Sequence, residues 1–448
     1  MKVLFVNPYI YDFTAFDLWL RPVGNLYLAA VVEKYTNAEI YWLDTLDRFQ
    51  DDPDIKTGPY YKGKFFRNPV EKPLVYKDIP RVYSRYGIPE DSFRKKLENL
   101  DEVDIVFVTT LMTYWIDGVN YTLKELRNRF RNAKIVIGGI LPTLIGKSIS
   151  KYIDGDVFIS GYGEDQILEY LSSEGTVINP RPDLSDINNI PFPLNSFLSN
   201  RKVLPLLTSR GCPYRCTYCA SHILNKKFVQ REPEKIVEEI FFMNKNFNTE
   251  DFVIFDDAFL INKRNRFFPV FENVKKELNV RFHTPNGIHA GEIDKITANV
   301  LFNAGFKTLR LSFESTDESI LKLSSNKINT DQMKKAVENL VESGYRRDEI
   351  ECYILFGLPG QSAEMLERSL LFIKELGILP RLSYFSPVPG TIEFNKLRSE
   401  GLMMEKDFIY RTNKLFFLYK YSGFGRSEIK YFKDLTRDIC TLSNNSEN

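Results

Sequence analysis

The sequence predicts an α/β protein with a doubly wound parallel sheet at its N-terminus, followed by a partial (β/α)6 barrel and a helical C-terminal extension. Three observations support this. Apolar strand patterns alternate with helical patterns over residues 1–170. Six further strand–helix repeats follow over residues 201–400. The chain has 448 residues, 43% of them hydrophobic, which is enough for two or more domains with large cores.

The first region contains five short strand patterns that are apolar almost throughout, as expected for strands buried on both faces. They are residues 1–8, 38–44, 104–110, 134–139 and 155–161. Ligands of such sheets bind beyond the carboxyl ends of the strands. Glycine at these ends lets a ligand approach the backbone closely. The polar and glycine residues at the predicted ends are Asn7, Thr109, Thr110, Gly138, Gly139, Gly161 and Gly163.

Two segments interrupt the pattern. Residues 47–100 are rich in Pro, Gly, Tyr and Lys, and form an insertion that is either a surface excursion packed on the sheet or a substrate lid. Residues 171–200 combine prolines with Asn and Asp, which predicts an extended linker.

The second region predicts barrel strands at 203–209, 251–257, 280–286, 308–315, 349–357 and 381–387. By analogy with complete barrels, the active face lies at the carboxyl ends of these strands. Polar residues gather there, namely Asp256, Asp257, Asn286, Glu314 and Ser386. Residues 401–448 predict the helical C-terminal extension.

Composition excludes several classes of protein. The formal net charge is +1, so the overall charge of the chain does not favour a nucleic-acid partner. No apolar run approaches the ~18 residues of a membrane span, and the first residues form a strand pattern unlike a signal peptide. Five cysteines, three of them clustered, make a poor disulfide framework and favour a metal site in a reducing compartment. We therefore expect a cytoplasmic protein.

The clustered cysteines follow the first barrel strand with the spacing C-x3-C-x2-C, as Cys212, Cys216 and Cys219. Three thiolates on one short loop can bind three irons of a cubane cluster and leave the fourth iron open to a ligand. Gly211 and Pro213 help the loop to fold around the cluster. The alternative is a zinc-stabilised binding protein, in which His222 completes the ligand set.

This spacing, with Tyr218 before the last cysteine, resembles the radical S-adenosylmethionine (SAM) superfamily over roughly residues 200–400. Other segments resemble family motifs in the expected order: 255–259, 311–315, 356–364 and 386–391. The resemblance implies a [4Fe–4S] cluster on the three cysteines and SAM as a second cofactor. It further implies SAM contacts from Tyr218, Asp256, Asp257, Glu314, Gly357 and Gly360. An electron from a low-potential donor would cleave SAM, and the resulting 5′-deoxyadenosyl radical would abstract hydrogen from the substrate.

The N-terminal region resembles the cobalamin-binding domain of one large subgroup of this family, through residues 21–31, 135–143 and 158–171. The resemblance implies a corrin at Thr109, Thr110, Gly138, Gly139, Gly161 and Gly163, and methylation of an unactivated carbon. The usual D-x-H-x-x-G cobalt-ligand motif is absent, however, and Leu141 stands where many relatives carry His. Cobalamin would lack a lower histidine, because no His precedes His222. The alternative is a cobalamin-free oxidoreductase or ring-forming enzyme with a vestigial domain.

The remaining candidates are ambiguous. His283 and His289 flank the third barrel strand's end, either as proton donors or as hydrogen-bonded packing residues. Cys352, inside a strand pattern, is expected in the core. The catalytic residues and the substrate are unknown, and small molecules, lipids and peptides all remain open.

Overall fold

The computed structural model describes residues 1–52, 54–326, 328–403 and 407–445, without the side chains of 442–445. The chain divides into two compact units, Met1–Val203 and Leu204–Asn448. Both consist of parallel strands with covering helices, which confirms the predicted fold class. The predicted domain boundaries themselves stay predictions.

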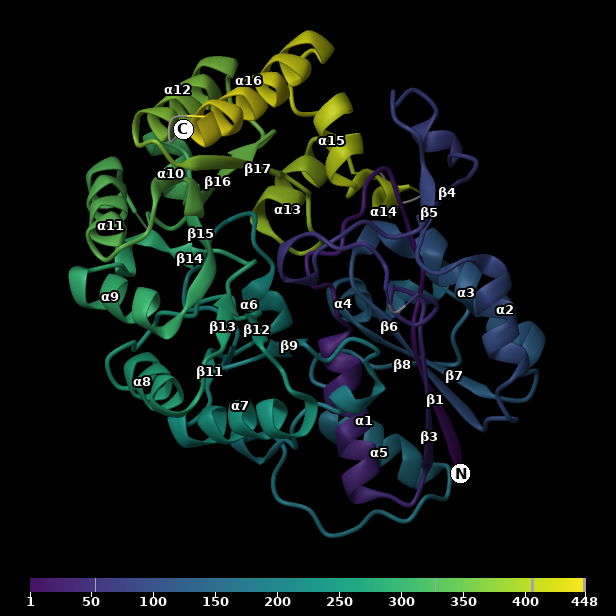
Figure 1. Ribbon diagram of the computed structural model, residues 1–448. Helices are drawn as coiled ribbons and strands as arrows, with labels where there is room; N and C mark the ends of the chain where they lie inside the picture. Colours follow the sequence, from purple (N-terminus) through teal and green to yellow (C-terminus); the bar gives the residue numbers. More distant parts are fainter. Residues whose placement is uncertain (53, 327, 404–406, 446–448) are drawn as a thin grey trace. The chain divides into compact units, whose positions relative to one another are not determined.

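The first unit contains a parallel sheet of order β3-β1-β6-β7-β8 (Figure 1). Along the chain this is the order 2-1-3-4-5, whose switch point lies between β1 and β6, and ligands of such sheets bind at the carboxyl edge. Every side chain of β6 is buried, so helices must cover both faces. The strands are β1 (Lys2–Asn7), β3 (Glu39–Asp44), β6 (Ile105–Thr110), β7 (Lys134–Gly139) and β8 (Val157–Phe158).

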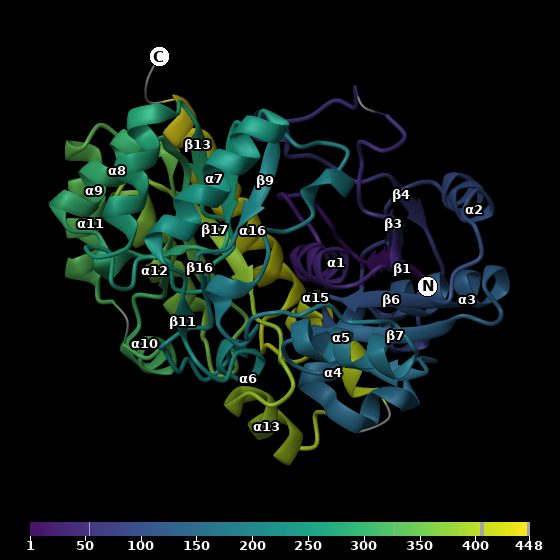
Figure 2. The ribbon, with the colours of Figure 1, turned by 90° about the horizontal axis from the view of Figure 1, so that it is seen from below.

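The helices of this unit cover the sheet in two groups. Helix α1 packs against α5, and α2 packs against α3. In Figure 2, α2 and α3 lie near each other at the right of the view, away from α1 and α5. The helices are α1 (Val23–Tyr35), α2 (Glu90–Glu98), α3 (Ile116–Arg129), α4 (Ile140–Ile145) and α5 (Glu164–Ser173), with the 3-10 turn η4 (Gly146–Lys151) after α4.

Strand β8 has two residues, although the sequence predicts a strand over 155–161. Beyond Phe158 the chain turns toward α4. The Ser160 hydroxyl donates to the carbonyl of Pro142 at 2.9 Å, and the Gly161 N–H donates to the Thr143 hydroxyl at 2.9 Å. After Ile159, whose N–H still donates to the Ile137 carbonyl of β7, these bonds hold Ser160 and Gly161 against α4.

The insertion at 47–100 is an ordered excursion. It contains α2, the strands β4 (Arg67–Pro69) and β5 (Ser84–Tyr86), and the turns η1 (Pro59–Tyr61) and η2 (Leu74–Tyr76). With β2 (Ile10–Asp12), these strands form an antiparallel sheet of order β2-β5-β4. Phe65 and Tyr86 are buried against Ile10 and Leu46, which attaches the excursion to the unit. The linker region contains only two short turns, η5 (Ile187–Asn189) and η6 (Asn195–Phe197).

The second unit is an open, barrel-like sheet of order β17-β16-β15-β13-β12-β9, with β14 paired beside β15. From β12 to β17 the pairs are parallel. The strands are β9 (Val203–Leu206), β12 (Asp251–Ile254), β13 (Arg281–His283), β14 (Ile288–His289), β15 (Phe306–Glu314), β16 (Ile350–Phe356) and β17 (Leu379–Tyr384).

Successive helices of the second unit pack side by side outside the sheet, α7 on α8, α8 on α9 and α9 on α11 (Figures 1 and 2). They are α7 (Pro233–Phe247), α8 (Phe267–Glu277), α9 (Lys295–Ala304), α10 (Glu318–Leu323), α11 (Thr330–Glu342) and α12 (Ala363–Glu375). Buried Phe252, Phe271, Phe282 and Phe306 form an aromatic core under α8.

The C-terminal region is helical in the described residues: α13 (Ile392–Ser399), α14 (Phe408–Arg411), α15 (Lys414–Lys420) and α16 (Arg426–Asn445). Helix α16 packs on β17 and α12. Residues 404–406 and 446–448 of the predicted extension lie outside the described part of the chain. No helix in the described ranges is long and apolar enough to cross a membrane.

Candidate active site: the cysteine loop

The three clustered cysteines lie on a loop that begins directly after β9. Two short strands, β10 (Ser209–Arg210) and β11 (Val229–Gln230), pair antiparallel and close its base. Gly211 has φ +83°, and a Cβ there would lie 2.7 Å from the carbonyl oxygen of Lys227. Only glycine combines that backbone conformation with so close an approach, so Gly211 fixes the direction in which the loop leaves β10.

Two carboxylates after β12 hold the two ends of this loop. Asp256 is 3% exposed and accepts the Thr208 N–H at 2.8 Å and the Ser209 hydroxyl at 2.6 Å. Burial raises the pKa of Asp256, and the hydrogen bonds from Ser209 and Thr208 oppose the shift. Asp257 accepts the Ser221 hydroxyl at 2.5 Å, just beyond the last cysteine. Both residues were predicted as SAM contacts, and the structure gives each a contact with the loop.

Two arginines donate hydrogen bonds to the backbone between β9 and β10, just before the cysteine loop. Arg231 donates to the Leu207 carbonyl at 2.8 Å, and Arg266 donates to the Thr208 carbonyl at 3.2 Å. Arg231 also pairs with the fully buried Glu239 of α7. The Glu239 pKa is raised by burial, which the charge of Arg231 opposes. The sequence did not predict either arginine as part of the site. Neither belongs to a recognisable motif, and neither is close in sequence to the carbonyl that it contacts there.

None of the three cysteines forms a disulfide; Cys212 and Cys216 are buried, and Cys219 is partly exposed. The Cys219 N–H donates to the Cys216 carbonyl at 3.1 Å, a tight turn that brings the last two together. The Ser221 N–H donates to the Cys219 sulfur at 3.5 Å. His222 lies on α6 (Ser221–Leu224) and is half-buried.

Within the described ranges, no three or more His, Cys, Asp or Glu side chains converge so as to hold one metal ion. A cubane cluster does not require such convergence, because each thiolate binds a different iron. Three thiolates on one short loop, with hydrogen bonds to sulfur from outside the ligand set, fit a cubane cluster.

Tyr218 and Glu314 lie near each other. The Tyr218 hydroxyl and the Ser324 hydroxyl form a hydrogen bond of 2.9 Å. Burial, followed by the negative charge of Glu314, raises the pKa of Tyr218. Glu314 ends β15 with φ +74°, where the register of β15 against β16 shifts. Such a backbone costs on the order of 1–3 kcal/mol and is concentrated at functional sites.

Gly357 and Gly360 follow β16 and lie in one turn, which is closed by hydrogen bonds within the same segment. Gly357 has φ +89° and donates its N–H to the Gln361 side chain at 2.8 Å, and Gln361 donates to the Leu355 carbonyl at 2.8 Å. Gly360 has φ +80°, and a Cβ there would meet no atom within 4 Å. Gly360 therefore borders open space, whereas a Cβ on Gly357 would lie 3.0 Å from the Leu418 side chain.

Two other polar residues of the predicted active face are used in packing. The Asn286 amide donates to the Phe255 carbonyl at 2.7 Å, and the Ser386 hydroxyl donates to the Thr412 carbonyl at 2.6 Å. The Ser386 bond connects the end of β17 to the C-terminal extension.

The two histidines differ. His283 is fully buried, with its nitrogens 3.0 Å from the Thr308 hydroxyl and 2.9 Å from Asp251. This favours the packing interpretation for His283. His289 lies on β14 with its ring against Tyr214 of the cysteine loop, 4.9 Å between centres. Cys352 is fully buried in β16, as expected of a core residue.

Comparison with known proteins decides the family. The family model described as the Radical SAM superfamily matches residues 206–373, which contain the cysteine loop and β12 to β16. The chain is an enzyme with a radical SAM domain.

Similar proteins extend beyond that domain. An uncharacterised methyltransferase of Pyrococcus horikoshii is 24% identical, covering 71% of each chain. The cytidylyl-2-hydroxyethylphosphonate methyltransferase of Streptomyces wedmorensis is 22% identical over 92% of this chain and 84% of its own. The radical SAM methyltransferase TsrM of Kitasatospora setae, solved with cobalamin and a [4Fe–4S] cluster, has a TM-score of 0.69 at 14% identity, covering 97% of this chain and 90% of its own. Membership in the family brings a [4Fe–4S] cluster and SAM as cofactors, and none of these matches supports a zinc-stabilised binding protein.

The N-terminal unit of this radical SAM enzyme presents two different kinds of glycine at its carboxyl edge. A Cβ on Gly138 or Gly161 would meet no atom within 4 Å. A Cβ on Gly139 would lie 2.4 Å from the Thr110 carbonyl, and one on Gly163 would lie 3.2 Å from Leu28. Gly139 and Gly163 are thus needed for packing, and Gly138 and Gly161 border open space.

The threonines predicted beside them are buried. Thr110 donates its hydroxyl to the Gly138 carbonyl at 2.8 Å and accepts the Leu141 N–H at 3.0 Å. Its hydroxyl hydrogen therefore already takes part in a hydrogen bond within the protein. Thr109 is 7% exposed, and Leu141 is buried.

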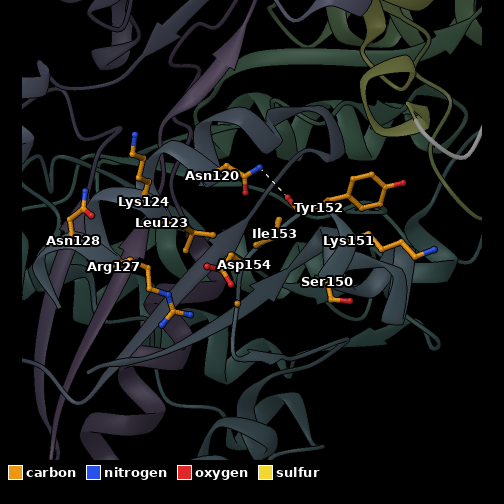
Figure 3. Close-up of a pocket in the computed structure, with 11 residues that line it drawn as sticks. Asn120, Leu123, Lys124, Arg127, Asn128, Ser150, Lys151, Tyr152, Ile153 and Asp154 are labelled. Atoms are coloured by element: carbon orange, nitrogen blue, oxygen red, sulfur yellow. Dashed lines mark hydrogen bonds between the residues drawn. The ribbon is translucent and has the colours of Figure 1, made fainter. Parts of the chain in front are cut away.

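A pocket of about 790 Å³ lies at the opposite edge of this unit (Figure 3). Its residues come from α3, between Asn120 and Asn128, and from the segment that leads into β8. Because α3 runs from the carboxyl end of β6 to the amino end of β7, Asn128 near its end lies at the amino edge of the sheet. None of the predicted cofactor residues lines this pocket.

Proposed function

We propose that this radical SAM enzyme binds cobalamin at the carboxyl edge of its N-terminal sheet and methylates an unactivated carbon. The observation that carries the proposal is the open space over Gly138 and Gly161 at that edge. The 2-1-3-4-5 strand order supports it, since ligands of such sheets bind at the carboxyl edge. The related methyltransferases, and the cobalamin in the similar TsrM structure, support the choice of cofactor and reaction.

The cluster is proposed to bind Cys212, Cys216 and Cys219, with its fourth iron open to SAM. When bound, the cluster supplies one electron for cleavage of the SAM sulfonium. Asp256 and Asp257 keep the loop in place from β12. Tyr218 and Glu314 are proposed to border the bound SAM, and Gly360 to give it room beside β16.

At the N-terminal edge, Gly138 and Gly161 are proposed to admit the corrin. Thr109 remains a candidate polar contact. Thr110, Gly139 and Gly163 are proposed to shape the edge. The Thr110 hydroxyl is hydrogen-bonded within the unit, and a Cβ on either glycine would lie close to neighbouring atoms. A cobalamin bound here would receive no histidine ligand from this unit, because residues 1–221 contain no His.

The reaction needs an external low-potential electron donor. We propose that the enzyme works in the reducing cytoplasm, where cysteines outside disulfides and an iron–sulfur cluster persist. Small molecules, lipids and peptides all remain possible substrates.

Cobalamin retention after anaerobic reconstitution and gel filtration tests the corrin site. We expect about one cobalamin per chain for the parent. Gly138→Leu adds a side chain where a Cβ meets nothing within 4 Å, so it should abolish retention without lowering the melting temperature. Asn128→Leu adds the same side chain at the opposite edge, in the pocket of Figure 3, and should retain cobalamin. A parent that retains no cobalamin would favour the vestigial-domain alternative.

Product analysis tests the methylation. Radical formation converts SAM into methionine and 5′-deoxyadenosine, whereas donation of its methyl group leaves S-adenosylhomocysteine. We expect S-adenosylhomocysteine only from cobalamin-loaded enzyme. Formation of 5′-deoxyadenosine alone, with cobalamin bound, would contradict a methyltransferase and favour an oxidoreductase or ring-forming enzyme.

A further inference from the structure

Helix α10 ends with a serine at a position that favours glycine. The Ser325 N–H donates to the Lys322 carbonyl at 3.2 Å, and the Asn326 N–H donates to the Leu321 carbonyl at 2.9 Å. These two bonds define a Schellman motif with Ser325 in the left-handed conformation, at φ +61°. A non-glycine residue there costs on the order of 1 kcal/mol, so we expect the serine side chain to make a compensating interaction.

The Ser325 hydroxyl makes two contacts with the cysteine loop. It accepts the Arg215 N–H at 3.0 Å and donates to the Cys216 sulfur at 3.9 Å. Because a lone pair of the oxygen is held by the Arg215 N–H, the hydroxyl hydrogen is free to point at the sulfur. Glycine at this position would keep the Schellman motif and lose both contacts.

The neighbouring residues fix the same geometry. The Thr217 N–H donates to the Leu323 carbonyl at 2.9 Å, and Ser324 bonds to the Tyr218 hydroxyl at 2.9 Å. Three successive residues, 323–325, therefore hold residues 215–218 against the end of α10. Only the Ser325 contact reaches a sulfur atom.

We propose that Ser325 is a positioning residue whose hydrogen bond to Cys216 raises the reduction potential of the cluster. Reduction adds negative charge that spreads onto the thiolate sulfurs. A hydrogen bond to sulfur stabilises that charge and so makes reduction easier. The proposal rests on the assignment of the cluster to Cys212, Cys216 and Cys219.

The test is a redox titration of the reconstituted enzyme followed by electron paramagnetic resonance. Ser325→Gly suits the left-handed backbone, so its melting temperature should equal or exceed that of the parent. Its cluster should keep four irons and titrate at a more negative midpoint potential. Ser324→Ala is the matched control, because it removes a neighbouring hydroxyl that contacts Tyr218 and no sulfur. We expect the control to titrate like the parent.

Two results would overturn the inference. One is an unchanged midpoint potential in Ser325→Gly with four irons bound. The other is an equal shift in Ser325→Gly and Ser324→Ala, which would mean that loop position and not the sulfur contact sets the potential. A parent enzyme that binds no iron would instead overturn the cluster assignment, so the two failures are distinguishable.

Discussion

The ring of Tyr214 lies against the imidazole of His289, with centres 4.9 Å apart and planes inclined by 31°. Tyr214 belongs to the cysteine loop and His289 to β14, which pairs with β15. The contact therefore connects the loop, through β14, to the strand that ends in Glu314.

This contact separates the two interpretations of His289. If the ring contact is what matters, His289→Phe should keep 5′-deoxyadenosine formation, since phenylalanine preserves the aromatic packing. His289→Ala should lower the unfolding free energy by about 1 kcal/mol, the usual size of an aromatic pair. Thermal melts and SAM-cleavage assays of both variants check this. Inactive His289→Phe with a full cluster would favour the proton-donor interpretation.

Gly211 should be required for cluster assembly. Gly211→Ala places a Cβ 2.7 Å from the Lys227 carbonyl at φ +83°, so the loop must shift. We expect less iron per chain. The control is Gly423→Ala, which has nearly the same φ of +84° but open space around the Cβ. That variant should show only the backbone cost, roughly 1–2 kcal/mol, with its iron intact. Equal iron in both variants would contradict this role of Gly211.

Asp44 should make the stability of the N-terminal unit depend on pH. Burial, followed by repulsion from Asp47, raises the pKa of Asp44 from 3.8 to about 7. One of its oxygens accepts from Asn7 and Leu46, and the other is buried without a hydrogen bond.

The folded protein therefore holds a proton on Asp44 that the unfolded chain loses near pH 4, so this group's contribution to stability falls as pH rises from about 4 to 7. Asp44→Asn imitates the protonated form. We expect it to gain up to about 4 kcal/mol over the parent at pH 8, and little at pH 4. Melting temperatures across this range provide the check, and a gain independent of pH would refute the expectation.

The sequence predicted the parts of the site that are local in the chain. The spacing of Cys212, Cys216 and Cys219 predicts a cluster loop because one loop would supply all three ligands, and this assignment stays a prediction. The strand–helix alternation likewise predicted both sheets, since each pattern is read within about ten residues.

Contacts between distant residues could not be predicted. Ser325 reaches Cys216 across 109 residues, and Asp256 reaches Thr208 across 48. Gly138 and Gly139 look equivalent in sequence, yet only Gly139 packs against a Thr110 carbonyl. Their difference depends on the neighbouring strand, which a sequence pattern does not place in space.

The most direct test of the cluster assignment compares two full-length variants. One replaces Cys212, Cys216 and Cys219 with Ala. The other replaces Cys352 and Cys440 with Ala, leaving only the three loop cysteines of the chain's five. After anaerobic reconstitution with iron and sulfide, each is given SAM and a chemical reductant, and 5′-deoxyadenosine is measured. We expect none from the triple variant and parental amounts from the double variant, with about four irons per chain. Undiminished 5′-deoxyadenosine from the triple variant would contradict the assignment of the cluster to this loop.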